Sequence, residues 1–431
     1  MALRSVDVVD ESGLTSLLAE MADRHSVPGG VLGILREKQV TVVHTGVADV
    51  ASGEPITPGT RFGVGSITKP ITATVILRLA AEGYLTIDDP LAEHVPELRE
   101  SEWARTATIR DLLANRSRIP LRTAWEFDLE GDDRDVLARC VAQIGTDRPT
   151  GAFWSYSNLG WVVLGRLIEN LTGLAWEDAI QRHVLDPFAM DQTTFALAPV
   201  AESRATGHEV TPNGPQPVPF WSARSYCSAG TSVLSTATDL LRFAATHLDD
   251  PYLATMRETH ADISIHGWLD GWCLGWARFD WDGEPVWGWD GVLPGQRMVL
   301  RILPAHKTAV ILATNGSTGR AMCRSLLQPL MEELGITVPA LRLQPKPGAS
   351  VDLARFAGEY MWPDRRCRVT ATDDSLAIEV DDRRVTAAPT GDGIFLIDPD
   401  NPDNPTVTFG GFDTAGQPQI IYVMLWGMPR A

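Results

Sequence analysis

Two side chains three positions apart, Ser66 and Lys69, have the types and spacing that nucleophilic catalysis requires. They stand at the start of a helix expected over residues 68–82, so both project from one face within reach of each other. A serine is a weak nucleophile until a base takes its proton, and burial at a helix N-terminus can make a lysine neutral enough to be that base. The pair alone is also compatible with a capped helix and a solvated lysine. Pro70 removes an N–H from the first helical turn, which can alter the placement of Ser66.

A phenol and an amide, Tyr156 and Asn158, follow in a turn before a helix expected over residues 159–172. Tyr156 can move a proton between Ser66 and a leaving group if neighbouring cations lower its pKa, and Asn158 can orient Lys69 or a substrate carbonyl. Taken alone, these residues are also explained by an ordinary turn. Together with the first pair, they supply the groups that one reaction needs, in a consistent chain order.

From about residue 14 to residue 334 the chain resembles the superfamily of class C β-lactamases, penicillin-binding proteins and serine esterases. The stretches that carry the resemblance are Phe62-Gly63-Val64-Gly65-Ser66-Ile67-Thr68-Lys69, Thr108-Ile109-Arg110-Asp111-Leu112-Leu113, Tyr156-Ser157-Asn158-Leu159-Gly160, Asp186-Pro187-Phe188-Ala189-Met190 and Ser235-Thr236-Ala237-Thr238-Asp239-Leu240. The resemblance implies an antiparallel sheet flanked by helices, an all-helical region, and a cleft between them. It also implies an acyl-enzyme on Ser66 and no metal or organic cofactor.

In this family a third motif, Lys or His followed by any residue and Gly, lies on the sheet edge that faces the serine. The equivalent stretch here is Trp289-Asp290-Gly291. Tryptophan cannot attract a substrate carboxylate as lysine or charged histidine does, although its ring can stack and its N–H can donate. An ester, thioester or amide without that carboxylate is therefore favoured over a β-lactam antibiotic. By analogy of position, the peptide N–H groups of Ser66 and Val292 form the oxyanion hole.

Three functions stay open for this set of residues. In the first, a serine hydrolase forms an acyl-enzyme on Ser66 and water releases the acyl group. In the second, an amine or alcohol replaces water, as in an acyltransferase or a peptide cyclase of the penicillin-binding-protein-type thioesterases of natural-product biosynthesis. In the third, the chain is a binding protein that has kept the fold and lost turnover. The first two functions imply a small-molecule or peptide acyl substrate.

Secondary-structure patterns place strands at both ends of the main part of the chain and helices between them. A hairpin is expected over residues 30–36 and 39–47, and strand-like patterns return over residues 271–289 and 298–314. A final helix is expected over residues 320–334. This order predicts an α/β (α+β) fold in which both ends of the chain contribute to one sheet.

The density of proline and glycine over residues 339–350 predicts a linker between two domains. Residues 1–338 are then the β-lactamase-like catalytic domain. Residues 351–431 contain short alternating stretches separated by Asp, Pro and Gly, which predicts a small β-barrel domain. This segment resembles the lipocalin-like module of some family members, with Phe356-Ala357-Gly358-Glu359-Tyr360 as its opening.

Composition narrows the possible partners and the location of the protein. There are 37 Lys and Arg residues against 55 Asp and Glu residues, which gives a formal net charge of −18 and argues against nucleic acid and anionic membranes as partners. The five cysteines have no metal-type spacing and favour reduced, buried thiols, and the histidines form no ligand pattern, so no metal is expected. The first residues lack the pattern of a secretory signal, so a cytoplasmic location is expected. The sequence does not predict the oligomeric state.

Overall fold

The described part of the chain covers most of its 431 residues. The computed structural model describes residues 10–117, 119, 138–139, 141, 153–196, 204–263, 265, 269–339, 343, 351–362, 365–380, 383–391, 393–398 and 405–431. Within these ranges, every helix is too short or too polar to cross a lipid bilayer.

The centre of the N-terminal part is a seven-stranded antiparallel sheet with the order β2-β1-β12-β11-β10-β9-β8. Its strands are β1 (Gly29–Arg36), β2 (Gln39–Gly46), β8 (Gly271–Trp272), β9 (Ala277–Trp281), β10 (Glu284–Leu293), β11 (Gln296–Leu303) and β12 (Thr308–Thr314). The predicted hairpin β1–β2 pairs with the last strand, β12, so segments from both ends of this part build one sheet. The predicted α/β (α+β) class is confirmed.

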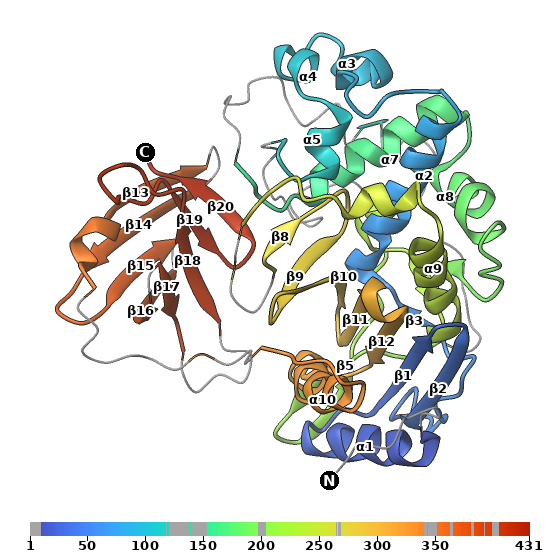
Figure 1. Cartoon of the computed structure of the whole chain (residues 1–431). Coiled ribbons are helices and arrows are strands. Elements are labelled where there is room, and N and C mark those ends of the chain that lie inside the picture. Colours follow the sequence, from blue (N-terminus) through green and yellow to red (C-terminus); the bar gives the residue numbers. More distant parts are fainter. Residues whose placement is uncertain are drawn as a thin grey trace.

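Helices cover both faces of this sheet. They are α1 (Glu11–Arg24), α9 (Ala237–Asp249) and α10 (Gly319–Glu333). A methyl group added to Gly30 would meet Met322 of α10, whereas one added to Gly33 would meet Leu241 of α9. Because these glycines are an odd number of residues apart on one strand, α9 and α10 lie on opposite faces. Figure 1 shows α1 beside α10 at the end where the N-terminus lies.

A helical region lies on the side of the sheet that α9 covers. It includes the helices that carry Lys69 and follow Tyr156. Its helices are α2 (Thr68–Ala81), α3 (Leu91–His94), α4 (Glu102–Thr106), α5 (Ile109–Leu113), α7 (Asn158–Thr172) and α8 (Trp176–Ile180). Helix α2 is buried from Thr68 to Leu77, and it contacts α7 and α8. A helix that is apolar all round requires such burial.

The C-terminal part is an eight-stranded antiparallel meander in which each strand pairs with the next. The strands are β13 (Gly358–Trp362), β14 (Arg365–Ala371), β15 (Leu376–Val380), β16 (Arg383–Gly391), β17 (Ile394–Leu396), β18 (Thr406–Gly410), β19 (Ile420–Val423) and β20 (Trp426–Pro429). A bridge between Tyr360 and Arg430 brings the first and last strands together, so the sheet nearly closes on itself. The all-β prediction for this part is confirmed.

Two hydrophobic cores correspond to these two parts, but one hairpin contributes to both. Ile421 of β19 and Met428 of β20 are buried in the C-terminal core. Tyr422 and Leu425 of the same hairpin are buried in the large N-terminal core. In Figure 1, β20 is the C-terminal strand nearest to the N-terminal part. The predicted linker, residues 339–350, lies almost wholly outside the described residues, and the predicted domain boundaries stay predictions.

Candidate active site

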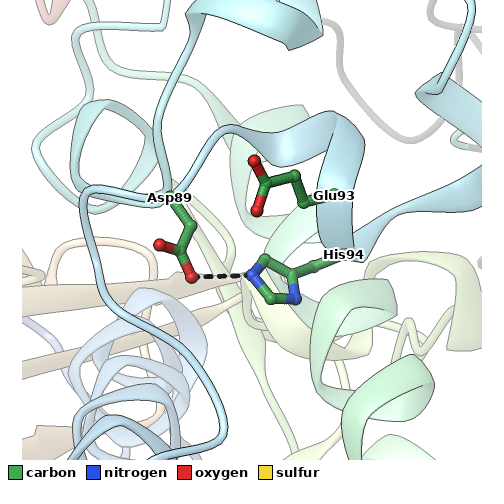
Figure 2. A group of neighbouring side chains, drawn as sticks. All are labelled: Asp89, Glu93 and His94. Atoms are coloured by element: carbon green, nitrogen blue, oxygen red, sulfur yellow. Dashed lines mark hydrogen bonds and ion pairs between the residues drawn. The ribbon is translucent and has the colours of Figure 1, made fainter.

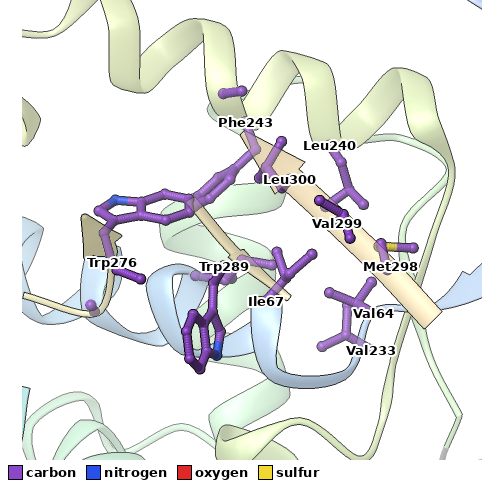
Figure 3. Close-up of a cluster of buried hydrophobic side chains, with 14 of the residues drawn as sticks. Val64, Ile67, Val233, Leu240, Phe243, Trp276, Trp289, Met298, Val299 and Leu300 are labelled. Carbon is purple, nitrogen blue, oxygen red and sulfur yellow. The ribbon is translucent and has the colours of Figure 1, made fainter. Parts of the chain in front are cut away.

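Ser66 is fixed by a tight turn that leads into helix α2. The 3-10 turn η1 (Gly65–Ile67) starts at Gly65, whose φ of +58° favours glycine. Ile67 is fully buried, and Figure 3 shows it in one cluster with Trp289 and Met298. Ser66 itself is only half-buried, so its hydroxyl lies at the edge of the core.

Pro70 lies in the first turn of helix α2. It is the third residue of α2, and the first N–H groups of a helix have no partner within the helix. The missing donor therefore costs no hydrogen bond within α2, and an effect of Pro70 on the placement of Ser66 stays a prediction.

The side chains of Ser66, Lys69 and Tyr156 meet at one oxygen atom. Lys69 Nζ donates a hydrogen bond to Ser66 Oγ over 3.0 Å, and the Tyr156 hydroxyl donates to the same oxygen over 2.9 Å. The Nζ atom of Lys69 also lies 4.8 Å from the centre of the Tyr156 ring. The structure therefore brings together the three groups that the sequence proposed as one set, from two segments 90 residues apart.

Lys69 is fully buried, and no carboxylate pairs with it within the described residues. Its second hydrogen bond goes to the backbone carbonyl of Ala229, over 2.5 Å. Burial lowers the pKa of the Lys69 amine well below its ordinary value of 10.5. The position of Lys69 in the first turn of α2 acts in the same direction, because the helix N-terminus carries partial positive charge. This amine is thus suited to accept a proton.

Tyr156 differs from the expectation in its electrostatics. Burial raises the pKa of its phenol above the ordinary value of 10.0, and hydrogen bonds with Ser66 and Trp289 oppose this only in part. The lowering by neighbouring cations that the sequence suggested is wrong, because Lys69 is itself disposed to be neutral. The phenol therefore keeps its proton and acts as a donor.

Trp289 faces Tyr156 and is 2% exposed. Its indole N–H donates to the Tyr156 hydroxyl over 3.3 Å, and the two ring centres are 5.5 Å apart. Trp272 packs edge-on against both rings. Of the two roles that the sequence left open for this tryptophan, the structure gives hydrogen-bond donation to Tyr156.

Backbone segments approach Ser66 so closely that only glycine fits at three positions. A methyl group on Gly65 would lie 2.5 Å from the amide nitrogen of Val292, and one on Gly291 would lie 2.1 Å from the carbonyl oxygen of Val64. A methyl group on Gly230 would lie 3.0 Å from the amide nitrogen of Ser66. The amide nitrogen of Val292 is thus placed beside the turn that bears Ser66, which is what an oxyanion site requires.

Asn158 makes no hydrogen bond to Lys69, one of the two partners that the sequence suggested for it, and its role toward a substrate carbonyl stays a prediction. It is the first residue of α7, and its side chain makes no hydrogen bond to any described residue. The carbonyl of Ala229 occupies the second hydrogen-bonding position of Lys69 instead. Sequence reasoning missed Ala229, and nothing in its type could have revealed it, because the contact uses only the backbone.

A second group of polar side chains lies on the helical region, outside this site. Ligand atoms of Asp89, Glu93 and His94 lie within 4.8 Å of one another. Figure 2 shows these three side chains side by side. The Asp89 carboxylate already accepts from the His94 ring over 2.8 Å and from the backbone and hydroxyl of Thr86. These bonds close the turn before α3, and they account for the group as local structure.

The sequence of this chain is similar to those of known proteins. A family model described as Beta-lactamase matches residues 14–327. A protein named Penicillin-binding protein 4, from Amycolatopsis lactamdurans, is 33% identical over 361 residues, which cover 78% of this chain and 93% of that protein. The residues that the family model matches include both motifs that supply the three clustered side chains.

Solved structures show the same architecture. The crystal structure of SurE superposes with a TM-score of 0.81 at 27% identity and covers 98% of this chain and 99% of that chain. A class C beta lactamase from Rhodobacter sphaeroides, at 20% identity, has a TM-score of 0.63 and covers 75% of this chain and 100% of that chain. SurE thus matches both parts of the molecule, whereas the class C enzyme matches about three quarters of it.

Proposed function

This chain belongs to the beta-lactamase family, and we propose that it is a serine hydrolase that cleaves an ester, thioester or amide through an acyl-enzyme on Ser66. The observation that carries this proposal is the convergence of two donors on Ser66 Oγ, from Lys69 Nζ at 3.0 Å and from the Tyr156 hydroxyl at 2.9 Å. A serine with a buried, unpaired lysine beside it has the base that it needs.

Acylation starts with the neutral form of Lys69. Its Nζ takes the proton of Ser66 as Oγ forms a bond to the carbonyl carbon of the substrate. The peptide N–H groups of Ser66 and Val292 stabilise the charge on the carbonyl oxygen in the tetrahedral intermediate. When the intermediate collapses, the leaving alcohol, thiol or amine takes the proton of the Tyr156 hydroxyl, and Lys69 returns a proton to the Tyr156 oxygen.

Deacylation uses Lys69 as the base a second time. Water gives a proton to Lys69 as its oxygen attacks the acyl carbon, and Lys69 returns that proton to the Ser66 oxygen when the second intermediate collapses. The high pKa of Tyr156 suits the role of proton donor, because a phenol that ionised readily would be deprotonated when the leaving group needs its proton.

The third motif supports a substrate without a carboxylate next to the reacting carbonyl. Trp289 contributes no charge, and its N–H is directed to Tyr156. A β-lactam antibiotic is therefore a weaker candidate than an ester, thioester or amide of an uncharged acyl group.

Acyl transfer to an amine or alcohol is the second candidate, and the full-length likeness to SurE favours it. SurE has also been solved with D-Leu, at 26% identity and a TM-score of 0.78 to this chain. An amino acid carries an amine of the kind that such a transfer would use as acceptor. The two candidates share the acyl-enzyme and differ only in the group that releases the acyl chain.

A burst experiment tests the proposal. The wild-type protein should release about one equivalent of p-nitrophenol rapidly from an activated ester, and mass spectrometry should find the acyl group on the peptide that contains Ser66. Ser66→Ala should remove both the burst and the adduct. A wild-type protein that forms no adduct with esters, thioesters or amides would favour the third function, a binding protein. Adding an amine and analysing the products then separates hydrolysis from transfer.

A further inference from the structure

The backbone next to Tyr156 is hydrogen-bonded to the C-terminal part of the molecule. Tyr156 N donates to the carbonyl of Leu425 over 3.1 Å, and Ser155 N donates to the carbonyl of Asn115 over 3.0 Å. Asn115 follows helix α5, whereas Leu425 lies in the turn between β19 and β20. The segment that bears Tyr156 is therefore attached to the helical region on one side and to the β19–β20 hairpin on the other.

Side chains reinforce this contact. Gly427 N of β20 donates to Ser155 Oγ over 3.2 Å, and the ring centre of Tyr422 lies 6.2 Å from that of Trp154. A methyl group on Gly427 would lie 2.6 Å from the carbonyl oxygen of Trp154 and 2.9 Å from the Tyr422 ring. Only a glycine permits this approach between the two backbones.

The turn of the hairpin has an unusual conformation at the same point. Val423 pairs with Trp426, so Met424 and Leu425 alone form the loop. Met424 has a φ of +58°, in the left-handed region that a bulky side chain rarely adopts. Its neighbour Leu425 is 8% exposed and presents its carbonyl to Tyr156. Contacts outside the hairpin therefore help to keep this turn in place.

We propose that the β19–β20 hairpin positions Tyr156 for proton transfer, which makes the C-terminal part a component of the active site. This inference rests on the proposed function. The rings of Trp272 and Trp289 restrict the tilt of the Tyr156 ring. The hydrogen bond from Tyr156 N to the carbonyl of Leu425 fixes the position of the Tyr156 backbone. A reacting group displaced by about 1 Å can lose about a hundredfold in rate, so a small shift of the hairpin is enough to disturb catalysis.

The test compares two esters of the same acyl group in the full-length protein. A p-nitrophenyl ester needs no proton on its leaving group, whereas an alkyl ester does, and Tyr156 is the proposed donor. In Gly427→Ala, the added methyl group moves the hairpin away from Trp154. We expect kcat for the alkyl ester to fall by about tenfold or more, with KM within about twofold and the p-nitrophenyl burst nearly unchanged.

Gly391→Ala is the matched control, because it lies in β16 of the same sheet and nothing comes within 4 Å of the added methyl group. Both rates should stay at the wild-type level in this variant. If Gly427→Ala slows the two esters by the same factor, or slows neither, the hairpin does not position the proton donor and the inference is overturned.

Ser155→Ala provides a second test that removes one oxygen atom and adds no bulk. It deletes the acceptor of the Gly427 N–H, so we expect the same selective loss on the alkyl ester, by about fivefold for one hydrogen bond. It decides the question if Gly427→Ala does not fold. A wild-type protein that forms no adduct on Ser66 contradicts the proposed function itself, whereas normal acylation with unselective variants contradicts only the positioning role.

Discussion

At the scale of single residues, the site depends on a lysine that is buried without a counter-ion. Lys69 is fully buried, and its two hydrogen bonds go to neutral oxygen atoms, Ser66 Oγ and the Ala229 carbonyl. The unfolded chain binds a proton at Lys69 more readily than the folded protein does, so at pH values below the ordinary lysine pKa of 10.5 this residue lowers the free energy of unfolding. This destabilisation becomes smaller as pH rises from the lowered pKa of the folded state towards 10.5. A neutral amine beside Ser66 is obtained at this cost.

The pH dependence of acylation follows from the same residue. Only neutral Lys69 can accept the Ser66 proton, so the single-turnover acylation rate should rise with pH through one ionisation and reach its plateau below 10.5, the ordinary lysine pKa. Tyr156 should add no descending limb near its ordinary value of 10.0, because burial raises its pKa. Stopped-flow release of p-nitrophenol, corrected for spontaneous hydrolysis, measures the profile. A rate that still rises around 10.5 would rule out a lysine neutralised by burial.

At the scale of elements, the boundaries of helices and strands that depend on neighbouring residues could be predicted from the sequence. The periodic apolar residues of α2 and the richness of β1 and β2 in Val, Ile and Leu gave boundaries within about two residues of those observed. The motif around Ser66 and Lys69 also lies within one helical turn, so spacing alone put these side chains on one face. Such features could be predicted because they depend on a few neighbouring residues in the sequence.

Contacts between distant segments were less predictable. The strand-like patterns over residues 271–289 did not reveal that tight turns divide this region among three strands, β8, β9 and β10, including one turn with positive φ at Asp282 and Gly283. The carbonyls of Ala229 and Leu425 belong to the backbone, which every residue type shares, so no sequence signal marks their place in the site.

The turn η1 gives a prediction at this scale. Gly65→Ala adds a methyl group 2.5 Å from the Val292 nitrogen at a residue with a φ of +58°. We expect acylation to fall by about a hundredfold or more, because the serine and the oxyanion donor are forced apart. Gly83→Ala, at the other end of α2, is the control: its φ is +82° and the added methyl group meets open space. That variant should lose roughly 1 kcal/mol of stability and acylate normally. Equal loss of activity in both would mean that strain alone is responsible.

At the scale of the whole molecule, one hairpin joins two hydrophobic cores. Ile421 and Met428 point to the C-terminal core, whereas Tyr422 and Leu425 point to the N-terminal core. Alternate residues of a strand face opposite sides of a sheet, so β19 can serve both at once. The likeness to SurE also covers both parts of the chain. Unfolding of the two parts should therefore be coupled.

Truncation of Tyr422 should uncouple them. Its side chain is 5% exposed and packs on Trp154, whereas its neighbour Ile421 stays in the C-terminal core. We expect calorimetry to show one transition for the wild type and two for Tyr422→Ala, because losing a large buried ring costs about 3–5 kcal/mol at the contact between the parts. Phe412→Ala removes a ring that is 44% exposed and in neither core, so its transition should stay single. A single transition for Tyr422→Ala, shifted to lower temperature, would mean that the hairpin stabilises the protein without coupling its two cores.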